Sequence, residues 1–343
     1  MTVSRSAPIP DTLDEALSPS WLSAALGAEV VSVATGDLDQ RVSTNAPVVV
    51  ELAGGERRRL WIKGYFSELG RVYRIAGVPE AMFYSELAGR LDMRLLRPAF
   101  AAADLATQAN VVVTEDVAGD GAVFLHALDA YSVDQTAESL DQLARLHGQT
   151  WMEPSLGSAA WLDSRVELYT ITRGLADIEA NFGGPVGAGV PEDVRDPQRL
   201  FDAFKAVGEF VTDADPWCVI HGDAHIGNVF LDPAGRPSWC DWQLVQRGPN
   251  GIDVGYHIAS ALTVADRRAN ENDLVRHYIE RLVAAGGPDL SGADPWRAVR
   301  RGMVHGFYLW AITLKVDPRK TAVLLERLGT AVADHGVYSE VLP

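Results

Sequence analysis

The chain has 343 residues, of which 47% are hydrophobic and 22% are charged, an ordinary composition for a globular protein of one large core or two modest ones. Its formal net charge of −16 at pH 7 argues against nucleic acids and anionic membranes as partners. No apolar run reaches the length of a signal peptide or a membrane-spanning segment. We therefore expect a soluble, cytoplasmic protein.

The first third of the chain is predicted to be rich in β-structure. Hydrophobic periodicity indicates, in chain order, a helix interrupted near Pro19, three strands, a second helix and a fourth strand. These elements are expected over residues 13–26, 30–35, 46–52, 58–62, 79–91 and 111–114. Residues 115–121 lose the pattern, and we interpret them as a hinge.

Helical periodicity dominates the rest of the chain. Helices are expected over residues 132–150, 164–180, 197–212, 254–265, 271–285, 296–314 and 320–333. We therefore predict an α+β protein with a small β-rich N-terminal lobe over residues 1–114, the hinge at 115–121, and a larger helical C-terminal lobe over residues 122–343. Aromatic residues near the end of the 296–314 helix are expected in the core, and the family resemblance given below implies that some of them line an acceptor pocket.

The segment that carries most potential chemistry runs from His221 to Gln243, HGDAHIGNVFLDPAGRPSWCDWQ. Phosphoryl transfer needs an acceptor for a hydroxyl proton and oxygen ligands for Mg²⁺. Asp223 can accept the proton, and Asn228 and Asp241 can hold the metal. The three residues therefore form a candidate catalytic and metal site.

A predicted β-hairpin explains how the two metal ligands could meet. Residues 229–231 and 238–240 read as short strands, and residues 232–237 form a dense turn signal between them. A hairpin places its two open ends side by side. Asn228 enters one end and Asp241 leaves the other, so both side chains could converge on one ion.

This ordered set of residues resembles the catalytic loop and metal aspartate of the aminoglycoside phosphotransferase and choline kinase-like family, which shares the protein-kinase fold. The ending Asp241-Trp242-Gln243, followed by Gly248-Pro249 and Ile252-Asp253-Val254-Gly255, is most similar to the ecdysteroid kinase-like branch. The resemblance implies a bilobal protein-kinase-like fold, with ATP and Mg²⁺ as cofactors and a small-molecule hydroxyl as the acceptor. It also implies that His221 anchors the loop rather than acting as a base.

Two other chemistries fit the sequence less well. A metal hydrolase built on His221, Asp223 and His225 would need further ligands at defined spacings, and the sequence contains no second histidine cluster. A protein kinase would carry an Asp-Phe-Gly signature and an Ala-Pro-Glu segment after the hairpin, and neither is present. A nucleotide-binding member of the family without transfer activity stays open as the alternative to an active small-molecule kinase.

Lysine is rare in this chain, with 4 Lys among the 30 Lys and Arg residues. Lys63 is the only one in the first 204 residues and ends a predicted strand. A compact ammonium at a strand end can reach nucleotide phosphates. Glu80, on the inward face of the 79–91 helix, is the expected partner of Lys63, with Glu86 as a less favourable alternative in helical register.

Other nucleotide contacts are less clearly marked, because no Gly-x-Gly-x-x-Gly loop is present. Ser43 and Thr44, between the first two predicted strands, could present hydroxyl and backbone N–H groups to phosphate instead. The resemblance places Glu115 and Val117 beside the nucleotide base. The sequence indicates neither the identity of the acceptor, nor a preference for ATP over GTP, nor an oligomeric state.

Overall fold

The computed structural model describes residues 7–290 and 292–342. For residues 167, 168 and 172 it describes the backbone only. The chain divides into two compact units. The smaller unit contains the chain up to Leu91, then Leu95–Val123 and Cys240–Leu244, and the larger unit contains Asp92–Arg94, Phe124–Trp239 and the chain from Val245 onward. Residues 240–244, which the prediction placed in the C-terminal lobe, thus belong to the smaller unit. Over the described ranges, no helix combines the length and apolar character needed to cross a membrane.

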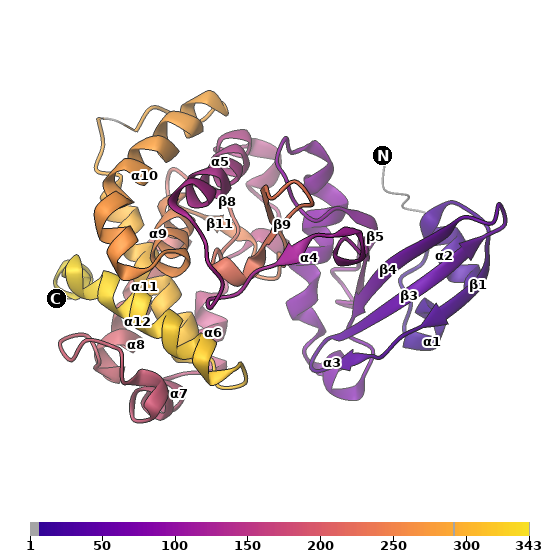
Figure 1. Ribbon diagram of the computed structural model, residues 1–343, viewed down its shortest axis with the longest axis horizontal. Coiled ribbons are helices and arrows are strands. Elements are labelled where there is room, and N and C mark those ends of the chain that lie inside the picture. Colours follow the sequence, from indigo (N-terminus) through magenta and orange to yellow (C-terminus); the bar gives the residue numbers. More distant parts are fainter. Residues whose placement is uncertain (1–6, 291, 343) are drawn as a thin grey trace. The chain divides into compact units, whose positions relative to one another are not determined.

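An antiparallel sheet forms the centre of the smaller unit, with strand order β1-β3-β4-β6-β5 and β2 paired to β3 (Figure 1). Its strands are β1 (Val30–Thr35), β2 (Asp39–Gln40), β3 (Thr44–Leu52), β4 (Arg57–Gly64), β5 (Pro98–Ala103) and β6 (Asn110–Glu115). The four predicted strands are confirmed. The sequence prediction missed β2, which is only two residues long, and β5, which is rich in alanine.

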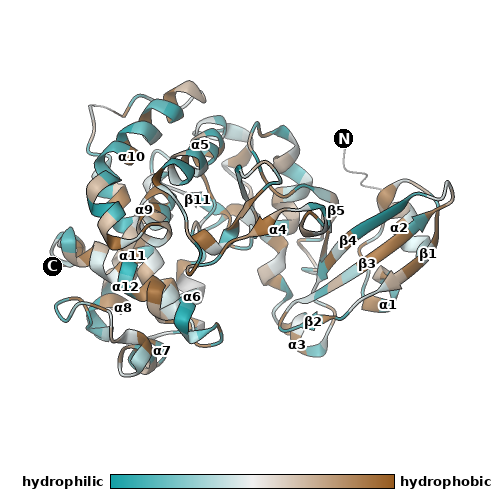
Figure 2. Ribbon diagram, viewed as in Figure 1, coloured by the Kyte–Doolittle hydropathy of each residue, from teal (hydrophilic) through white to brown (hydrophobic). Residues whose placement is uncertain are grey.

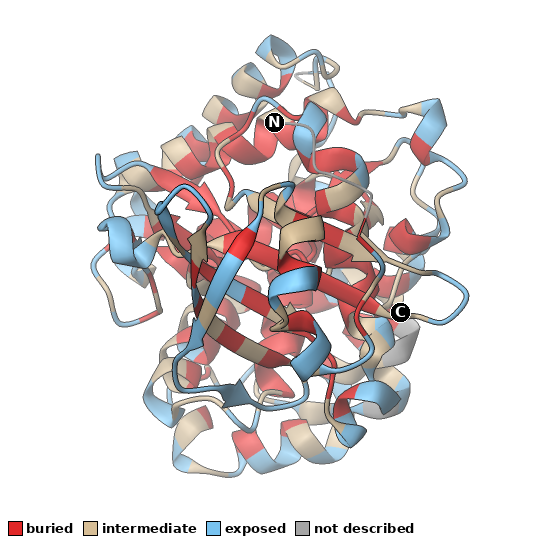
Figure 3. Cartoon of the chain, turned by 90° about the vertical axis from the view of Figure 1, so that its right-hand side faces the viewer, coloured by how far each residue is buried: buried red, intermediate tan, exposed pale blue. Residues whose placement is uncertain are grey.

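The two faces of this sheet differ in burial, as the alternation along β3 shows. Buried and exposed residues also alternate along the strands that face the viewer in Figure 3. Ala46, Val48 and Val50 are buried in a core that also includes Trp21 of the neighbouring helix. The opposite face of β4 carries charged side chains, so β4 is more hydrophilic than β3 (Figure 2). Lys63 is on this second face, because its strand neighbours Ile62 and Gly64 are buried while Lys63 is not.

Two short helices, α1 (Leu13–Ala16) and α2 (Pro19–Leu26), precede the sheet, and the predicted interruption near Pro19 is confirmed. The Ser18 side chain accepts a hydrogen bond from the N–H of Trp21 and caps α2, and proline is well tolerated at the first helical position. The sequence prediction missed the short helix α3 (Glu68–Val72) and the 3₁₀ turn at Arg74–Gly77.

The helix expected over residues 79–91 is helical over nearly this range but is not one regular α-helix. It begins as α4 (Val78–Met82), continues as a π-helical turn over Phe83–Leu87 and ends as a 3₁₀ turn over Ala88–Arg90. A π turn shifts the following side chains around the helix axis, and such turns are frequent at functional sites. The α-helical part carries Glu80.

The larger unit is mainly helical (Figure 1). Its helices are α5 (Val133–Gln149), α6 (Val166–Thr172), α7 (Leu175–Phe182), α8 (Pro197–Thr212), α9 (Gly251–Ala261), α10 (Val264–Ala284), α11 (Trp296–Ala311), α12 (Pro318–Asp334) and α13 (Val337–Val341). The helix predicted over 164–180 is divided at Gly174, α10 begins earlier than expected because Thr263 caps it, and α13 was not predicted. Short 3₁₀ turns occur at Pro154–Leu156, Ala160–Leu162, Pro185–Gly187 and Ile226–Asn228.

Two small antiparallel pairings position the loop between residues 221 and 228. Strand β8 (Cys218–Ile220) pairs with β11 (Gln246–Gly248), and β9 (Val229–Leu231) pairs with β10 (Pro237–Trp239). The predicted hairpin is thus confirmed, with Val229 opposite Trp239. Asp232 stabilises its turn by accepting hydrogen bonds from the N–H groups of Ala234 and Arg236, both at 2.9 Å.

Helices α9 and α11 approach each other so closely that glycine is required where they cross. A Cβ atom at Gly255 would lie 1.8 Å from the carbonyl oxygen of Val299, and one at Gly302 would lie 2.3 Å from that of Ile252. Both helices also carry side chains that contact the 221–228 loop, so their spacing affects the candidate site described below.

Replacing Gly255 with alanine should therefore destabilise the larger unit. The new methyl group has no space beside the Val299 backbone, and overpacking of this kind typically costs about 1–3 kcal/mol. Gly157→Ala is a matched control in the same unit, because a Cβ there would make only ordinary contacts, at 3.4 Å or more. Chemical unfolding of both variants checks the prediction, and equal stability of the two would contradict it.

Candidate active site

The larger unit holds Asp223 in a short loop between β8 and β9. One carboxylate oxygen accepts a hydrogen bond from the Tyr256 hydroxyl at 3.0 Å, and the other accepts one from the Asn228 amide at 3.2 Å. The Asn228 amide also donates to the Asp223 carbonyl oxygen at 2.8 Å. The structure thus brings two predicted site residues together, and the Asp223 side chain keeps 26% exposure, which leaves it accessible to a substrate.

The environment of Asp223 favours the ionised form. Burial acts to raise the pKa of this carboxyl group, but His225, His221 and the hydrogen bond from Tyr256 outweigh burial and lower the pKa to about 2. Asp223 is therefore a carboxylate at neutral pH. A carboxylate there can accept a hydrogen bond from a substrate hydroxyl and orient its oxygen.

The backbone of the loop is anchored by Asp253 on α9. Its carboxylate accepts hydrogen bonds from the N–H groups of His221 at 2.6 Å and Gly222 at 2.9 Å. His147 on α5 lies 3.1 Å from the same carboxylate and, through its other ring nitrogen, 2.7 Å from the Tyr278 hydroxyl. Although burial opposes it, the His147 hydrogen bond and the nearby charges lower the pKa of Asp253, so the anchor is ionised.

Two further histidines hold the carbonyl groups of this loop. His305 on α11 donates to the Gly222 carbonyl oxygen at 2.8 Å, and His257 on α9 donates to that of Ala224 at 3.2 Å. The other ring nitrogen of His257 lies 2.5 Å from the Ser139 hydroxyl. Burial lowers the pKa of both histidines, that of His257 to about 4. Both rings are therefore neutral at pH 7, each with one protonated nitrogen that donates to its carbonyl oxygen.

The histidines within the motif have distinct positions. His221 is fully buried, and its Nδ1 accepts the N–H of Asp223 at 3.3 Å, so it is an anchor of the loop. His225 Nδ1 accepts the N–H of Gly227 at 2.9 Å, and its Nε2 lies 3.6 Å from the Asp223 carboxylate. The ring edge of His225 also contacts Trp310 on α11, with 5.0 Å between ring centroids.

The smaller unit brings Lys63, Glu80 and Asp241 together. The Lys63 ammonium lies 2.7 Å from the Glu80 carboxylate and 3.3 Å from the Asp241 carboxylate. Glu80 is therefore the partner of Lys63, as predicted, whereas Glu86 is exposed. A contact between Lys63 and Asp241 was not anticipated from the sequence, where 178 positions separate the two residues.

These charges support one another. Burial alone would lower the pKa of Lys63, but the carboxylates of Asp241 and Glu80 outweigh burial and raise it. Burial raises the pKa of Glu80, and the adjacent ammonium opposes that effect. With the ammonium at 2.7 Å, we regard the pair as ionised near neutral pH, because a buried charge needs a partner of opposite sign.

The segment that carries Asp241 is fixed by its neighbours in the same unit. Asp241 has a φ of 60°, which is unusual for a residue other than glycine but is tolerated by aspartate. The Trp242 ring stacks on Phe83 with 3.9 Å between centroids, and the Gln243 amide donates to the Tyr65 hydroxyl at 2.7 Å. Phe83 belongs to the π turn that follows Glu80, so the same helical segment positions Glu80 and the Asp241 segment.

The predicted metal ligands suit Mg²⁺ by their chemistry. Asp241 offers a carboxylate with 43% exposure in the smaller unit, and Asn228 offers an amide oxygen in the larger unit. Magnesium prefers oxygen ligands and usually takes one or two from protein side chains, with phosphates and water completing its shell. In the described part of the chain, no three His, Cys, Asp or Glu side chains cluster as a metal site.

The remaining predicted nucleotide residues lie in the smaller unit. Thr44 begins β3 with its side chain buried, and Ser43 occupies the tight turn between β2 and β3. Glu115 ends β6, and its side chain pairs with Arg58. The N–H of Val117 donates to the Glu115 carbonyl oxygen at 3.0 Å. The resemblance placed the backbone of Glu115 and Val117 beside the nucleotide base. In this structure the Glu115 carbonyl and the Val117 N–H instead bond each other.

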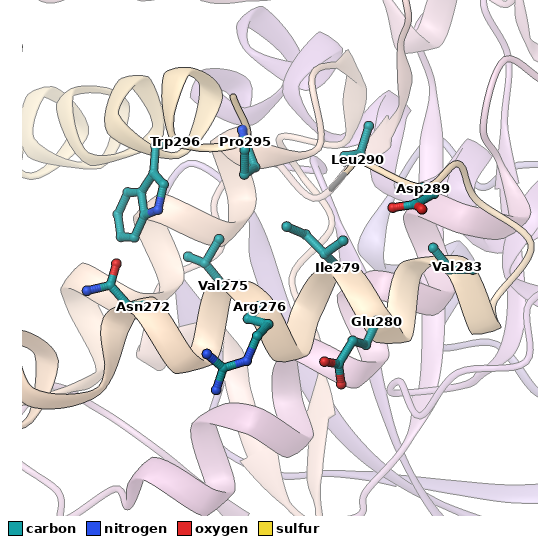
Figure 4. Close-up of a pocket in the computed structure, with 10 residues that line it drawn as sticks. All are labelled: Asn272, Val275, Arg276, Ile279, Glu280, Val283, Asp289, Leu290, Pro295 and Trp296. Carbon is teal, nitrogen blue, oxygen red and sulfur yellow. The ribbon is translucent and has the colours of Figure 1, made fainter. Parts of the chain in front are cut away.

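A cavity of about 680 Å³ lies elsewhere in the larger unit. It lies along one side of α10, and Asp289, Leu290, Pro295 and Trp296 complete its lining (Figure 4). Val275, Ile279 and Trp296 provide its apolar lining. None of its lining residues is a predicted site residue, so we do not assign it to the candidate active site.

Comparisons with known proteins agree with this geometry. No curated protein sequence matches the chain. The sequence profile of the ecdysteroid kinase-like family matches residues 192–286, which include Asp223, Asn228 and Asp241. The resemblance predicted from the motif is thus confirmed over this segment.

Solved structures extend the likeness to nearly the whole chain. A choline kinase from Cryptosporidium parvum Iowa II has a TM-score of 0.56 and 10% identity, covering 96% of this chain and 96% of that chain. An ethanolamine kinase from Plasmodium vivax has a TM-score of 0.50 and 10% identity, covering 90% of this chain and 83% of that chain. The chain has a protein-kinase-like fold. Sequence identity this low shows the fold alone, and the predicted fold class is confirmed.

Several residues that hold the predicted site residues in place were not recognised in the sequence. Tyr65 and the stacked pair of Phe83 and Trp242 fix the Asp241 segment, and His147 and His257 help to hold the loop in the larger unit. A signal did exist for the two histidines. Each occupies the buried face of an amphipathic or apolar helix, where a polar group requires a hydrogen-bond partner.

The neutral state of His257 predicts a specific dependence of stability on pH. Its pKa in the folded protein, about 4, is below the ordinary value of 6.5, so the unfolded chain binds more protons between these pH values. The free energy of unfolding should therefore decrease as the pH falls through this window, by up to about 1.4 kcal/mol per pH unit for one proton. Urea unfolding at pH 7, 6 and 5 should show a shallower decrease for His257→Gln than for wild type. Equal slopes would contradict the buried, neutral assignment.

Proposed function

We propose that this protein transfers the γ-phosphoryl group of Mg-ATP to a hydroxyl group of a small molecule. One observation carries the proposal: the ammonium of Lys63 lies within 3.3 Å of both Glu80 and Asp241. The sequence analysis had assigned Lys63 and Glu80 to the phosphates and Asp241 to the metal, as separate predictions. A paired lysine and a metal aspartate are the recurring parts of a kinase phosphate site. The kinase-like fold and the matched family segment support the same activity.

In this proposal, Lys63 binds phosphate oxygens of the nucleotide and Glu80 keeps the ammonium extended toward them. Lysine suits this role because its charge is compact and its stem is flexible. Ser43, in the turn before β3, could add a donor to the phosphates, and Thr44 could contribute its backbone. Backbone groups of Glu115 and Val117 would contact the base after the hydrogen bond between them opens.

Asp223 accepts the proton of the acceptor's hydroxyl group. The hydroxyl oxygen of the acceptor meanwhile forms a bond to the γ-phosphorus. The bond between that phosphorus and the β,γ-bridging oxygen breaks, and ADP leaves with the bonding electrons. Tyr256 and Asn228 hold the carboxylate in place by hydrogen bonds. Mg²⁺, held by Asn228 and Asp241, would neutralise the charge on the β- and γ-phosphoryl oxygens.

The acceptor would approach Asp223 beside His225 and Trp310. These aromatic rings meet edge to face at 5.0 Å, and Trp310 belongs to the aromatic end of the 296–314 segment that was expected to line a pocket. Aromatic side chains next to the Asp223 carboxylate suit a small molecule with an apolar body and a reactive hydroxyl. The proposal assigns no particular acceptor.

A screen of the purified protein with Mg-ATP tests this function. Aminoglycosides, choline-like amines, macrolides and sterols would be offered as acceptors, with GTP compared as donor, and ADP release and the mass of the product would be recorded. We expect at least one acceptor to stimulate ADP release and to gain one phosphoryl group. ATP binding without any transfer to the panel or to water would instead favour the nucleotide-binding alternative.

Asp223→Asn should reduce transfer to the active acceptor by about 100- to 10,000-fold, the usual range for a lost general acid–base group. The amide keeps the shape and can still bond Tyr256, so the melting temperature and ATP affinity should stay close to those of wild type. Asp273→Asn, at an exposed position on α10, is the matched control and should retain activity. Near-normal transfer by the Asp223 variant would remove this residue from the catalytic role.

A further inference from the structure

Tyr65 directly follows β4 and lies two residues after Lys63. Its ring is buried, with 7% of the residue exposed. A Cβ atom at Gly77 would lie 2.3 Å from the Tyr65 ring, so a glycine is needed at that position to leave room for it. The ring position is therefore fixed by packing, which gives the hydroxyl group a defined place.

The Tyr65 hydroxyl has one partner, which uses only half of its hydrogen-bonding capacity. Its oxygen accepts a hydrogen bond from the Gln243 amide at 2.7 Å. A tyrosine hydroxyl also carries one hydrogen that it can donate. Across residues 7–290 and 292–342, no acceptor for that hydrogen is found among the hydrogen bonds of Tyr65. The donor is thus available to a ligand.

The same hydroxyl is close enough to the charged residues to be affected by them. Burial raises the pKa of Tyr65 to about 12, with Lys63 opposing the shift and Glu80 and Asp241 adding to it. The group therefore remains protonated over the whole neutral range. It is a neutral donor two residues after Lys63, and it is bonded to Gln243, which is two residues after Asp241.

We propose that Tyr65 is a further nucleotide-binding residue, whose hydroxyl donates a hydrogen bond to a phosphate oxygen of the nucleotide bound by Lys63. This inference rests on the proposed function. Phosphate oxygens only accept hydrogen bonds, so they match the two donors Lys63 and Tyr65. A neutral hydroxyl adds a phosphate donor without adding a charge that would compete with Lys63 for Glu80 and Asp241.

Gln243 has a positioning role in this arrangement. Because its amide donates to the tyrosine oxygen, the hydroxyl hydrogen must point elsewhere. Gln243 is two residues after Asp241, so its hydrogen bond also connects the metal aspartate segment to the residue that binds phosphate. The ligand class is a nucleoside di- or triphosphate, because adenosine has no phosphate for Tyr65 to contact.

Calorimetric titration of Tyr65→Phe with ATP, ADP and adenosine tests the inference without requiring an acceptor or turnover. Phenylalanine keeps the ring against Gly77 and removes only the hydroxyl group. A hydrogen bond to a charged group contributes about 1.5–3 kcal/mol, so ATP and ADP should bind at least about tenfold more weakly. Adenosine affinity and the melting temperature should be unchanged. Tyr73→Phe, at an exposed tyrosine of the same unit, is the matched control and should bind all three ligands like wild type.

The outcomes separate this inference from the function on which it rests. If wild type binds ATP and the Tyr65 variant binds ATP and ADP equally well, Tyr65 does not contact phosphate, although the kinase proposal stands. If the variant loses adenosine affinity to the same extent as ATP affinity, or its melting temperature falls markedly, Tyr65 has a structural role and the inference is overturned. If wild type binds neither ATP nor ADP, the proposed function itself fails.

Discussion

The ammonium of Lys63, whose side chain is only 21% exposed, is the constraint on which the smaller unit depends. A charge removed from water must be compensated nearby, and here Glu80 and Asp241 provide two carboxylates within 3.3 Å. The ammonium therefore joins a strand, a helix and a segment from late in the sequence. This requirement explains why residues 240–244 belong to the smaller unit. Stacking of Trp242 on Phe83 adds apolar contact to the same connection.

In the larger unit, the main constraint is the need of one loop's backbone groups for hydrogen-bond partners. The loop that carries Asp223 is irregular, so its backbone groups cannot bond within a helix or sheet and need other partners. Asp253 accepts two N–H groups, and the neutral rings of His257 and His305 donate to two carbonyl oxygens. These side chains come from α9 and α11, whose close approach depends on glycine. Helix packing thus determines where the Asp223 carboxylate lies.

The sequence allowed the local features of this site to be predicted. The hairpin after Asn228 follows from a dense turn signal, and the assignment of Glu80 to Lys63 follows from helical register and the scarcity of lysine. The protein-kinase-like fold followed from the ordered motif and from the change from β-rich to helical periodicity. Each of these predictions depends on residues that are close in sequence or on a single periodic pattern.

Features that depend on long-range packing could not be predicted in the same way. The contact of Lys63 with Asp241 spans 178 positions, and no periodic pattern indicates such a pairing. The π turn at Phe83–Leu87 has the same local composition as an ordinary helix, so propensity does not reveal it. Strand β5 is largely alanine, which has low β-propensity, and only its pairing with β6 makes it a strand. Tyr65 carried no motif, and its importance depends on Gln243 and Gly77.

The central claim is that Asp241 belongs to a Mg²⁺-dependent nucleotide site built around Lys63. The most direct measurement is ATP affinity, determined by calorimetry with and without Mg²⁺, for wild type and Asp241→Asn. The account predicts that Mg²⁺ strengthens ATP binding to wild type by at least tenfold, about 1.4 kcal/mol, and has little effect on the variant. An equal gain from Mg²⁺ in both proteins would show that Asp241 does not hold the metal and would contradict the account.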